Sequence, residues 1–211
     1  MPVEYVTFRL ANHETPLWAV ANFSAGRYNR LGTGPTQYLS FHPMTPWAEI
    51  LRSEDRRTRD RALLLRYPLW AIRVQLEDEP TELTFDNAGS FGLAPADLVA
   101  DDQRPCQALA EGQRSAADGI RAFVAPSAAL PGTRNLVVLD AAVVTGYEVD
   151  PVGPEDLPTA MAAQGGRCPD DLWTLVHYRG AGTPHPAFDA WDGGDEFVFA
   201  EPPVISTSLV P

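Results

Sequence analysis

Cysteine and histidine are scarce in this sequence of 211 residues. The two cysteines, Cys106 and Cys168, are too few for a disulfide framework or a cysteine-based zinc site, and we expect both to be reduced thiols. The histidines are scattered and no HExxH motif occurs, so the sequence predicts no metal site. They are His13, His42, His177 and His185.

The sequence also lacks long hydrophobic runs and an excess of positive charge. No stretch approaches the ~20 apolar residues of a membrane span, and the N-terminal MPVEYVTFRL has neither the basic nor the apolar region of a signal peptide. The formal net charge of −12 disfavours binding to a phosphate backbone. We therefore predict a cytoplasmic protein that contacts neither membrane nor nucleic acid directly.

Three common motifs of nucleotide-binding and hydrolytic enzymes are missing or incomplete. Gly32-Thr33-Gly34 lacks the third glycine and the following helix of a dinucleotide fingerprint, and no GxxxxGK[ST] run is present. Ser127 lies in Pro-Ser-Ala and not in a GxSxG elbow. A Rossmann site, a P-loop and a hydrolase triad are therefore not expected.

The hydrophobic pattern predicts short strands with interspersed helices, which is an α+β protein. A helix is expected to start with Thr45 as the N-cap and Pro46 as its first residue, and a second helix is expected over 105–115. Strands are predicted at 3–10, 36–41, 69–76, 120–124, 135–139, 142–149, 172–178 and 196–200.

The prolines of 150–158 (DPVGPEDLP) mark a change in composition. We read this stretch as a linker, which divides the chain into a first domain at 1–149 and a C-terminal extension at 150–211. We expect the extension to pack on the same domain.

The stretch Phe23–Leu51 contains an arginine, a tyrosine and a glutamate on three successive elements. Arg27 falls in an irregular loop, Tyr38 on a strand and Glu49 at the fourth position of the predicted helix, one beyond the capping-box position. Such a set suits cleavage of the nicotinamide–ribose bond of NAD. Arginine binds pyrophosphate, an aromatic ring holds nicotinamide, and a carboxylate stabilises an oxocarbenium-like transition state.

Each of these residues also has a structural interpretation. Arg27 could pair a surface acid, Tyr38 could pack in the sheet, and Glu49 could favour the helix dipole. Ser127 could serve as a turn or N-cap residue. The residue types alone leave these alternatives open.

The order of several short motifs resembles the RES domain family, named for its Arg, Glu and Ser residues. The similarity covers about residues 5–145, with Tyr28 where tryptophan is common in the family and Ala25 in place of a glycine. The motifs are Phe8-Arg9, Gly26 to Asn29 (GRYN), QYLS around Tyr38, Ala48-Glu49, Gly119, Pro126-Ser127-Ala128 and Asn135 to Val138.

The resemblance implies a fold similar to that of ADP-ribosyltransferases, with a split mixed β-sheet and flanking helices. It implies a toxin of a RES–Xre toxin–antitoxin pair that degrades NAD, with phosphate (an NAD phosphorylase) or water (an NAD glycohydrolase) as the acceptor. NAD is then a substrate, phosphate a co-substrate, and no prosthetic group is expected. The implied partner is an Xre-type antitoxin, and a homo-oligomer stays open.

Residue by residue, the resemblance assigns catalytic roles to Arg27, Tyr38, Glu49 and Ser127. It assigns substrate contacts to Arg9, Tyr28 and Asn29. Two alternatives stay open at this level: transfer of ADP-ribose to a protein target, and a catalytically silent module that only binds a partner.

Overall fold

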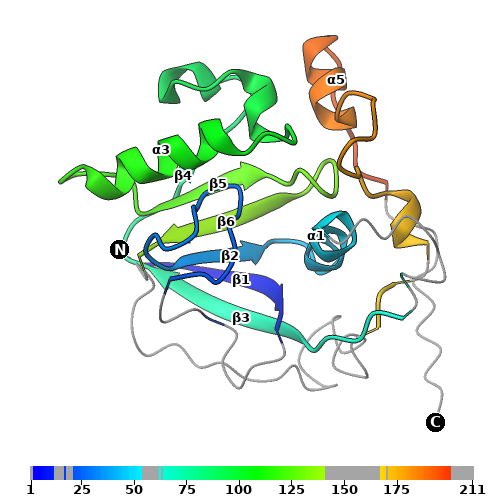
Figure 1. Ribbon diagram of the computed structural model, residues 1–211, viewed down its shortest axis with the longest axis horizontal. Helices are drawn as coiled ribbons and strands as arrows, with labels where there is room; N and C mark the ends of the chain where they lie inside the picture. The colour runs from blue at the N-terminus through cyan, green and yellow to red at the C-terminus, as the bar shows by residue number, and fades with distance from the viewer. Residues whose placement is uncertain are drawn as a thin grey trace.

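The fold is built on one mixed six-stranded sheet with strand order β3-β1-β2-β6-β5-β4 (Figure 1). The computed structural model describes residues 2–11, 17, 21–53, 62, 64–140, 167–169 and 171–200. The strands are β1 (Val3–Leu10), β2 (Thr36–Ser40), β3 (Leu69–Leu76), β4 (Thr81–Glu82), β5 (Ala122–Pro126) and β6 (Arg134–Leu139). The helices are α1 (Thr45–Ser53), α3 (Arg104–Ser115) and α5 (Pro186–Asp192), with 3₁₀ turns η1 (Ala88–Phe91), η2 (Pro95–Leu98) and η3 (Leu172–Thr174).

Strand pairing follows the alternation of apolar side chains. β1 and β3 pair antiparallel along their whole length, from Val3 opposite Leu76 to Leu10 opposite Leu69. β2 pairs antiparallel with β6, β6 with β5, and only the short β4 runs parallel to its neighbour β5. The predicted α+β class, a mixed sheet with flanking helices, is confirmed.

The two faces of the sheet carry separate hydrophobic clusters, because successive side chains of a strand point to opposite faces. Leu39, Ile72 and Leu136 belong to the cluster on one face, and all three are fully buried. Phe123 and Val137 belong to the other cluster, which also includes Leu98 of η2 and Ala110 of α3. In Figure 1, α3 lies along the β5–β6 side of the sheet and covers this second face.

Helix α1 stands beside the end of β2 and is held by a third cluster (Figure 1). Met44, Trp47, Ala48 and Leu51 are spaced at i, i+3, i+4 and i+7, so they form one buried stripe on the helix. The stripe packs against residues 129–130 and against Leu172 and Val176 of the C-terminal segment. Other residues of α1, among them Pro46, Glu49 and Arg52, line the site described below.

The start of α1 differs from the sequence prediction by one residue. The Met44 carbonyl accepts the hydrogen bond of the Ala48 N–H (3.0 Å), so Thr45 is already inside the helix. The Thr45 hydroxyl, expected to cap the helix, instead donates to Oγ1 of Thr133 at 2.9 Å. A long-range partner therefore replaced the local capping bond, and Glu49 sits one position further into the helix than predicted.

Two predicted strands in the C-terminal part are wrong. Residues 172–178 form the 3₁₀ turn η3 followed by irregular chain. Leu172 and Val176, four positions apart, are the buried residues that pack against α1, whereas a strand would bury every second side chain. Residues 196–200 alternate in exposure as a strand would, but no strand of the described part of the chain pairs with them. The predicted strand at 120–124 is present as β5, shifted to Ala122–Pro126.

The predicted strand at 142–149 and the predicted linker at 150–158 lie outside the described residues. The division into a domain at 1–149 and an extension at 150–211 therefore stays a prediction. Within the described ranges, no helix is both long and apolar enough to cross a bilayer.

The buried stripe of α1 yields a stability prediction. Trp47 is 1% exposed, so Trp47→Ala removes a fully packed indole and should lower the free energy of unfolding by about 3–5 kcal/mol. Leu31→Ala is the matched control, because Leu31 is 69% exposed and its truncation should change stability by less than about 0.5 kcal/mol. Chemical denaturation monitored by circular dichroism measures both. Equal effects of the two substitutions would contradict this account of how α1 is held.

Candidate functional site

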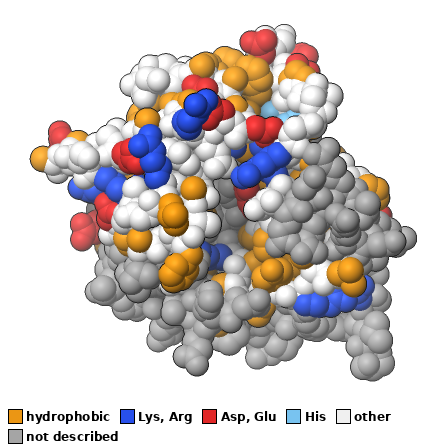
Figure 2. All heavy atoms as spheres, viewed as in Figure 1, with side chains coloured by type: hydrophobic (Ala, Val, Ile, Leu, Met, Phe, Trp, Pro, Cys, Tyr) orange, Lys and Arg blue, Asp and Glu red, His pale blue; other side chains and the backbone are white. Residues whose placement is uncertain are grey.

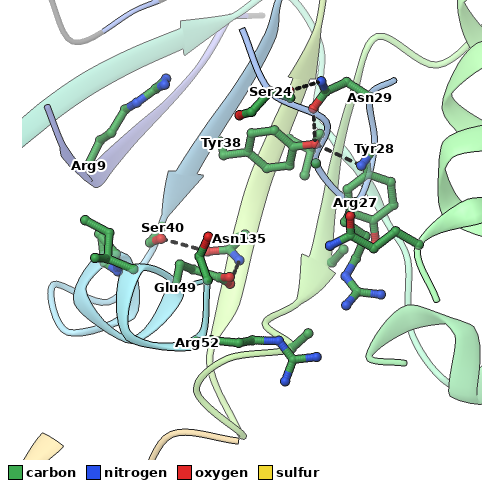
Figure 3. Close-up of a pocket in the computed structure, with 18 of the residues that line it drawn as sticks. Arg9, Ser24, Arg27, Tyr28, Asn29, Tyr38, Ser40, Glu49, Arg52 and Asn135 are labelled. Carbon is green, nitrogen blue, oxygen red and sulfur yellow. Dashed lines mark hydrogen bonds between the residues drawn. The ribbon is translucent and has the colours of Figure 1, made fainter. Parts of the chain in front are cut away.

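A cavity of about 360 Å³ opens between α1, the ends of β2 and β6, and the loop before β2 (Figure 3). Its wall combines main chain and side chains from segments far apart in the sequence. The polar residues of the wall are Arg9, Asn22, Ser24, Arg27, Tyr28, Asn29, Tyr38, Ser40, Glu49, Arg52, Ser53, Gln103, Asn135 and Arg179.

The carboxylate of Glu49 is fixed by two hydrogen bonds to the same oxygen. Oε1 accepts from Oγ of Ser127 at 2.9 Å and from Nδ2 of Asn135 at 3.2 Å. The Asn135 amide is itself oriented by Ser40, whose hydroxyl donates to Oδ1 at 2.7 Å (Figure 3). Oε2 accepts no hydrogen bond from the described residues and is left for a ligand.

Ser127 acts on the cavity only through Glu49. The residue is fully buried and is not part of the wall. Its Oγ accepts the backbone N–H groups of Ala129 and Leu130, each at 3.2 Å, and donates its proton to Glu49. The serine predicted as catalytic therefore lies outside the wall, where its hydroxyl ties α1 to the turn between β5 and β6.

Tyr38 is held by its hydroxyl group. Oη accepts the backbone N–H of Tyr28 and donates to Oδ1 of Asn29, both at 2.8 Å (Figure 3). Burial is the main cause that raises the pKa of Tyr38 above its ordinary value, so the phenol stays protonated. A side chain at Gly26 would place its Cβ 2.7 Å from this hydroxyl, which explains the glycine there.

Tyr28 and Asn29, predicted as substrate contacts, contribute to the wall mainly by supporting Tyr38. The Tyr28 ring is 3% exposed and packs edge to face on Phe123 at 4.8 Å. Asn29 is 1% exposed, and its Nδ2 donates to the Ser24 carbonyl at 2.9 Å. Both residues fix the loop that carries Arg27.

Arg27 is anchored to two main-chain carbonyls near η2. One terminal nitrogen donates to the Asp97 carbonyl at 3.1 Å, and the other donates to the Ala100 carbonyl at 2.7 Å. These acceptors are neutral, so they orient the guanidinium without neutralising it. The predicted phosphate-binding arginine thus lines the cavity, and its described hydrogen-bond acceptors include no carboxylate.

Arg9 lines the cavity, but its guanidinium is directed away from Glu49 (Figure 3). It donates to Oε1 of Gln37 at 3.1 Å. Gln37 precedes Tyr38 in β2, so their side chains lie on opposite faces of the sheet. The structure therefore does not bring the head group of Arg9 together with Arg27 and Glu49.

Two arginines of the cavity were missed by the sequence analysis. Arg52 is 3% exposed, forms an ion pair with Asp101 at 2.7 Å, and also donates to the carbonyl of His177. Burial is the main cause that lowers the pKa of Arg52, and the nearby positive charge of Arg27 adds to it. Arg52 follows Glu49 by three positions on α1, and this i, i+3 spacing was the signal available.

Arg179, the second missed arginine, comes from the segment that follows the predicted linker. No local pattern marks it, because its position depends on how residues 171–200 pack on the sheet domain.

The charge of the wall is opposite to that of the whole chain. The charged residues of the wall are Arg27, Arg52, Arg179 and one acid, Glu49, together with Arg9, whose head group is directed to Gln37. The chain as a whole has 28 acidic and 16 basic residues, and it contains no lysine, so every basic residue is an arginine. Low-dielectric walls focus such a field, and the cavity is therefore suited to an anionic ligand.

A histidine pair lies next to these arginines. The rings of His177 and His185 meet edge to face at 5.0 Å, and neither ring nitrogen of the buried His185 has a hydrogen-bond partner among the described residues. Burial, followed by the charges of His177 and Arg52, lowers the pKa of His185 to about 3. No group of three possible metal ligands occurs in the described part of the chain.

The protein is therefore an α+β protein whose mixed sheet carries an arginine-lined cavity around one fixed carboxylate. The same fold is found in the crystal structure of the M. tuberculosis MbcT-MbcA toxin-antitoxin complex, with a TM-score of 0.54 and 20% identity. That alignment covers 71% of this chain and 83% of the solved chain.

The chain belongs to the RES domain family, because the model of the RES domain matches residues 6–160. A curated relative is the "Probable NAD(+) phosphorylase Rv3189" of Mycobacterium tuberculosis, which is 32% identical over 114 residues. The match covers 54% of this chain, and the chain spans about half the length of that relative (52%). The predicted family is confirmed.

The hydroxyl of Tyr38 yields a prediction about the site's architecture. Tyr38→Phe leaves the Tyr28 N–H and the Asn29 Oδ1 without their partner, so it should lower the free energy of unfolding by about 1–3 kcal/mol. Tyr5→Phe is the matched control, because the Tyr5 hydroxyl makes no such bonds among the described residues, and it should be near neutral. Denaturant titration measures both. No difference between the two variants would show that the hydroxyl is not a structural tie.

The histidine pair yields a pH prediction. The pKa of His185 is about 3 in the folded chain and about 6.5 in the unfolded chain, so the unfolded state binds more protons below pH 6.5. Stability contributed by neutral His185 is therefore lost as the pH falls, by about 2 kcal/mol between pH 7 and pH 5.

Thermal or chemical unfolding of wild type and His185→Leu over this pH window tests the assignment. The variant should lose this part of the pH dependence, because leucine of similar size does not titrate. An unchanged slope in the variant would contradict it.

Proposed function

We propose that this protein is an NAD-consuming toxin enzyme that cleaves the nicotinamide–ribose bond of NAD and passes ADP-ribose to phosphate or water. The observation that carries the proposal is the carboxylate of Glu49, fixed through one oxygen in a cavity whose other charged wall residues are all arginines. The name of the relative, "Probable NAD(+) phosphorylase", supports the same reaction.

The arginines suit the pyrophosphate of a dinucleotide. Guanidinium groups bind phosphate oxygens through paired N–H donors and stay charged at all physiological pH values. Both described acceptors of Arg27 are neutral carbonyls, so no carboxylate is paired with its guanidinium there. We assign it to the pyrophosphate.

Tyr38 provides an aromatic wall rather than an acid or a base. Its hydroxyl is already occupied by Tyr28 and Asn29, and its raised pKa keeps it neutral. The ring lines the cavity and can pack against the nicotinamide or its ribose. We therefore assign Tyr38 to substrate positioning.

Glu49 is the group we assign to the chemical step. As the bond to nicotinamide breaks, positive charge develops on the ribose, and a carboxylate fixed nearby stabilises that charge at little reorganisation cost. Ser127 and Asn135 occupy Oε1, which leaves Oε2 for the ribose. Nicotinamide departs as a neutral base with the electron pair of the broken bond, so no general acid is needed.

An antitoxin partner in the cytoplasm completes the proposal. The solved protein of the same fold comes from a toxin–antitoxin complex, which supports a protein partner for this chain as well. The resemblance described above makes an Xre-type antitoxin the expected one.

Glu49→Gln tests the proposal. The amide keeps the size and can keep the hydrogen bonds of the carboxylate but removes its charge, so NAD consumption should fall by at least about 100-fold. Purified wild type and variant are incubated with NAD, with and without phosphate, and the products are resolved by mass. Glu111→Gln, at the exposed ion pair with Arg30, is the matched control and should retain wild-type activity.

The product masses separate the alternatives. Free ADP-ribose indicates hydrolysis, ADP-ribose carrying one phosphate indicates phosphorolysis, and labelled protein indicates ADP-ribosyl transfer. Folded wild-type protein that leaves NAD intact under every condition would overturn the proposal.

A further inference from the structure

The segment that follows the family match places an arginine in the cavity. Residues 6–160 match the RES domain, whereas Arg179 lies beyond that range and lines the cavity wall. The segment is fixed on both sides of Arg179. The His177 N–H donates to the Ala129 carbonyl at 2.9 Å, and the Gly180 N–H donates to Oδ2 of Asp101 at 2.7 Å.

A second anchor holds the same segment through α5. Phe188 and Trp191 of this helix pack on Phe85 with ring centroids 5.7 and 5.6 Å apart. Nε1 of Trp191 donates to Oδ1 of Asp86 at 2.8 Å. Arg179 is therefore carried by a chain segment attached to the sheet domain at two separate places.

Asp101 links this segment to α1. Its Oδ1 pairs with Arg52 while its Oδ2 holds the Gly180 N–H, so one carboxylate positions both Arg52 and the turn after Arg179. Arg52 also donates to the His177 carbonyl. Figure 2 shows acidic and basic side chains side by side with a histidine on this face, below α5.

Three positive groups act on the same region. Arg27, Arg52 and Arg179 all line the cavity wall. Burial and the positive charges of Arg27 and Arg179 lower the pKa of Arg52, while Asp101 and Glu49 raise it. Asp101 is shared with a backbone N–H, and Glu49 is bound to Ser127 and Asn135. Like charges around a buried arginine are stabilised by a bound anion.

We propose that Arg52 and Arg179 form the binding site for inorganic phosphate, the acceptor of the ADP-ribosyl group, and that Arg27 is left for the pyrophosphate of NAD. The assignment rests on the proposed function. Arg52 lies one turn from Glu49 on α1, beside the group that marks the reacting ribose carbon, whereas Arg27 is anchored across the cavity near η2 (Figure 3). The acceptor must reach that carbon, so we assign it to Arg52, which shares α1 with Glu49, and to Arg179, whose neighbour Gly180 is bound to the same Asp101 carboxylate as Arg52.

The step balances without any further reagent. The bond between the ribose carbon and the nicotinamide nitrogen breaks, and its electron pair leaves with neutral nicotinamide. A phosphate oxygen supplies the pair for the new carbon–oxygen bond, which gives ADP-ribose carrying a phosphate on that carbon. The two guanidinium groups hold the phosphate dianion beside the carbon and leave one of its oxygens available to attack.

Arg179→Ala and Arg179→Lys test the site through the dependence of the rate on each substrate. Loss of a charged, paired hydrogen-bonding group should raise the KM for phosphate at least about tenfold in Arg179→Ala, with a smaller rise in Arg179→Lys, which keeps the charge but loses the fork. The KM for NAD should change less than about threefold. Arg73→Ala is the matched control, because Arg73 pairs with Glu4 on the exposed side of β3 and lies outside the cavity wall.

The outcomes separate this inference from the proposed function. An unchanged phosphate KM in both Arg179 variants, or a parallel rise in the KM for NAD, would overturn the phosphate site while NAD cleavage stands. Wild-type cleavage that yields only ADP-ribose in phosphate buffer would also overturn it. Wild type that consumes no NAD would remove the proposed function and this inference together. Circular dichroism confirms that the variants are folded.

Discussion

The hydrogen bond between Ser127 and Glu49 is the interaction on which the site depends. It joins α1 to the turn after β5, and the two residues are 78 positions apart in the chain. Ser127 also accepts hydrogen bonds from two backbone N–H groups of its own turn, which fix the direction of its hydroxyl. The hydrogen bond that this hydroxyl donates then orients the Glu49 carboxylate. A buried serine outside the cavity thereby decides where the one acid of the cavity wall points.

The second constraint is electrostatic. A chain with a net charge of −12 concentrates arginines around one cavity and leaves a single carboxylate among them. The acidic surface and the basic cavity have different consequences: the surface disfavours polyanions such as nucleic acid, and the cavity favours a small anion. The cost of burying Arg52 is offset by Asp101, whose other oxygen holds the C-terminal segment in place. The position of Arg52 in the cavity wall and the attachment of this segment are therefore physically linked through one carboxylate.

The local alternation of apolar residues predicted most strands of the sheet. The predictions failed where contacts between distant residues determine the local structure. The alternation in 3–10 and 69–76 fixed both strands to their observed bounds, because each strand pairs along its whole length and buries one set of side chains. Residues 196–200 alternate as well, but a strand also needs a neighbour, and none is present there in the described structure. Thr45 is a residue type that favours the N-cap, yet its hydroxyl donates to Thr133 of the distant β5–β6 turn.

The sequence by itself determined the family, the α+β class and the three residues Arg27, Tyr38 and Glu49 that meet at one cavity. Their order along a short stretch carried that information. Only the tertiary structure decided that Ser127 positions Glu49 from within the core, and that the head group of Arg9 is directed to the other face of the sheet. It alone brought Arg52 and Arg179 to the cavity. The physical reason is that direction and proximity depend on strand register and on contacts between residues tens of positions apart, which no local pattern encodes.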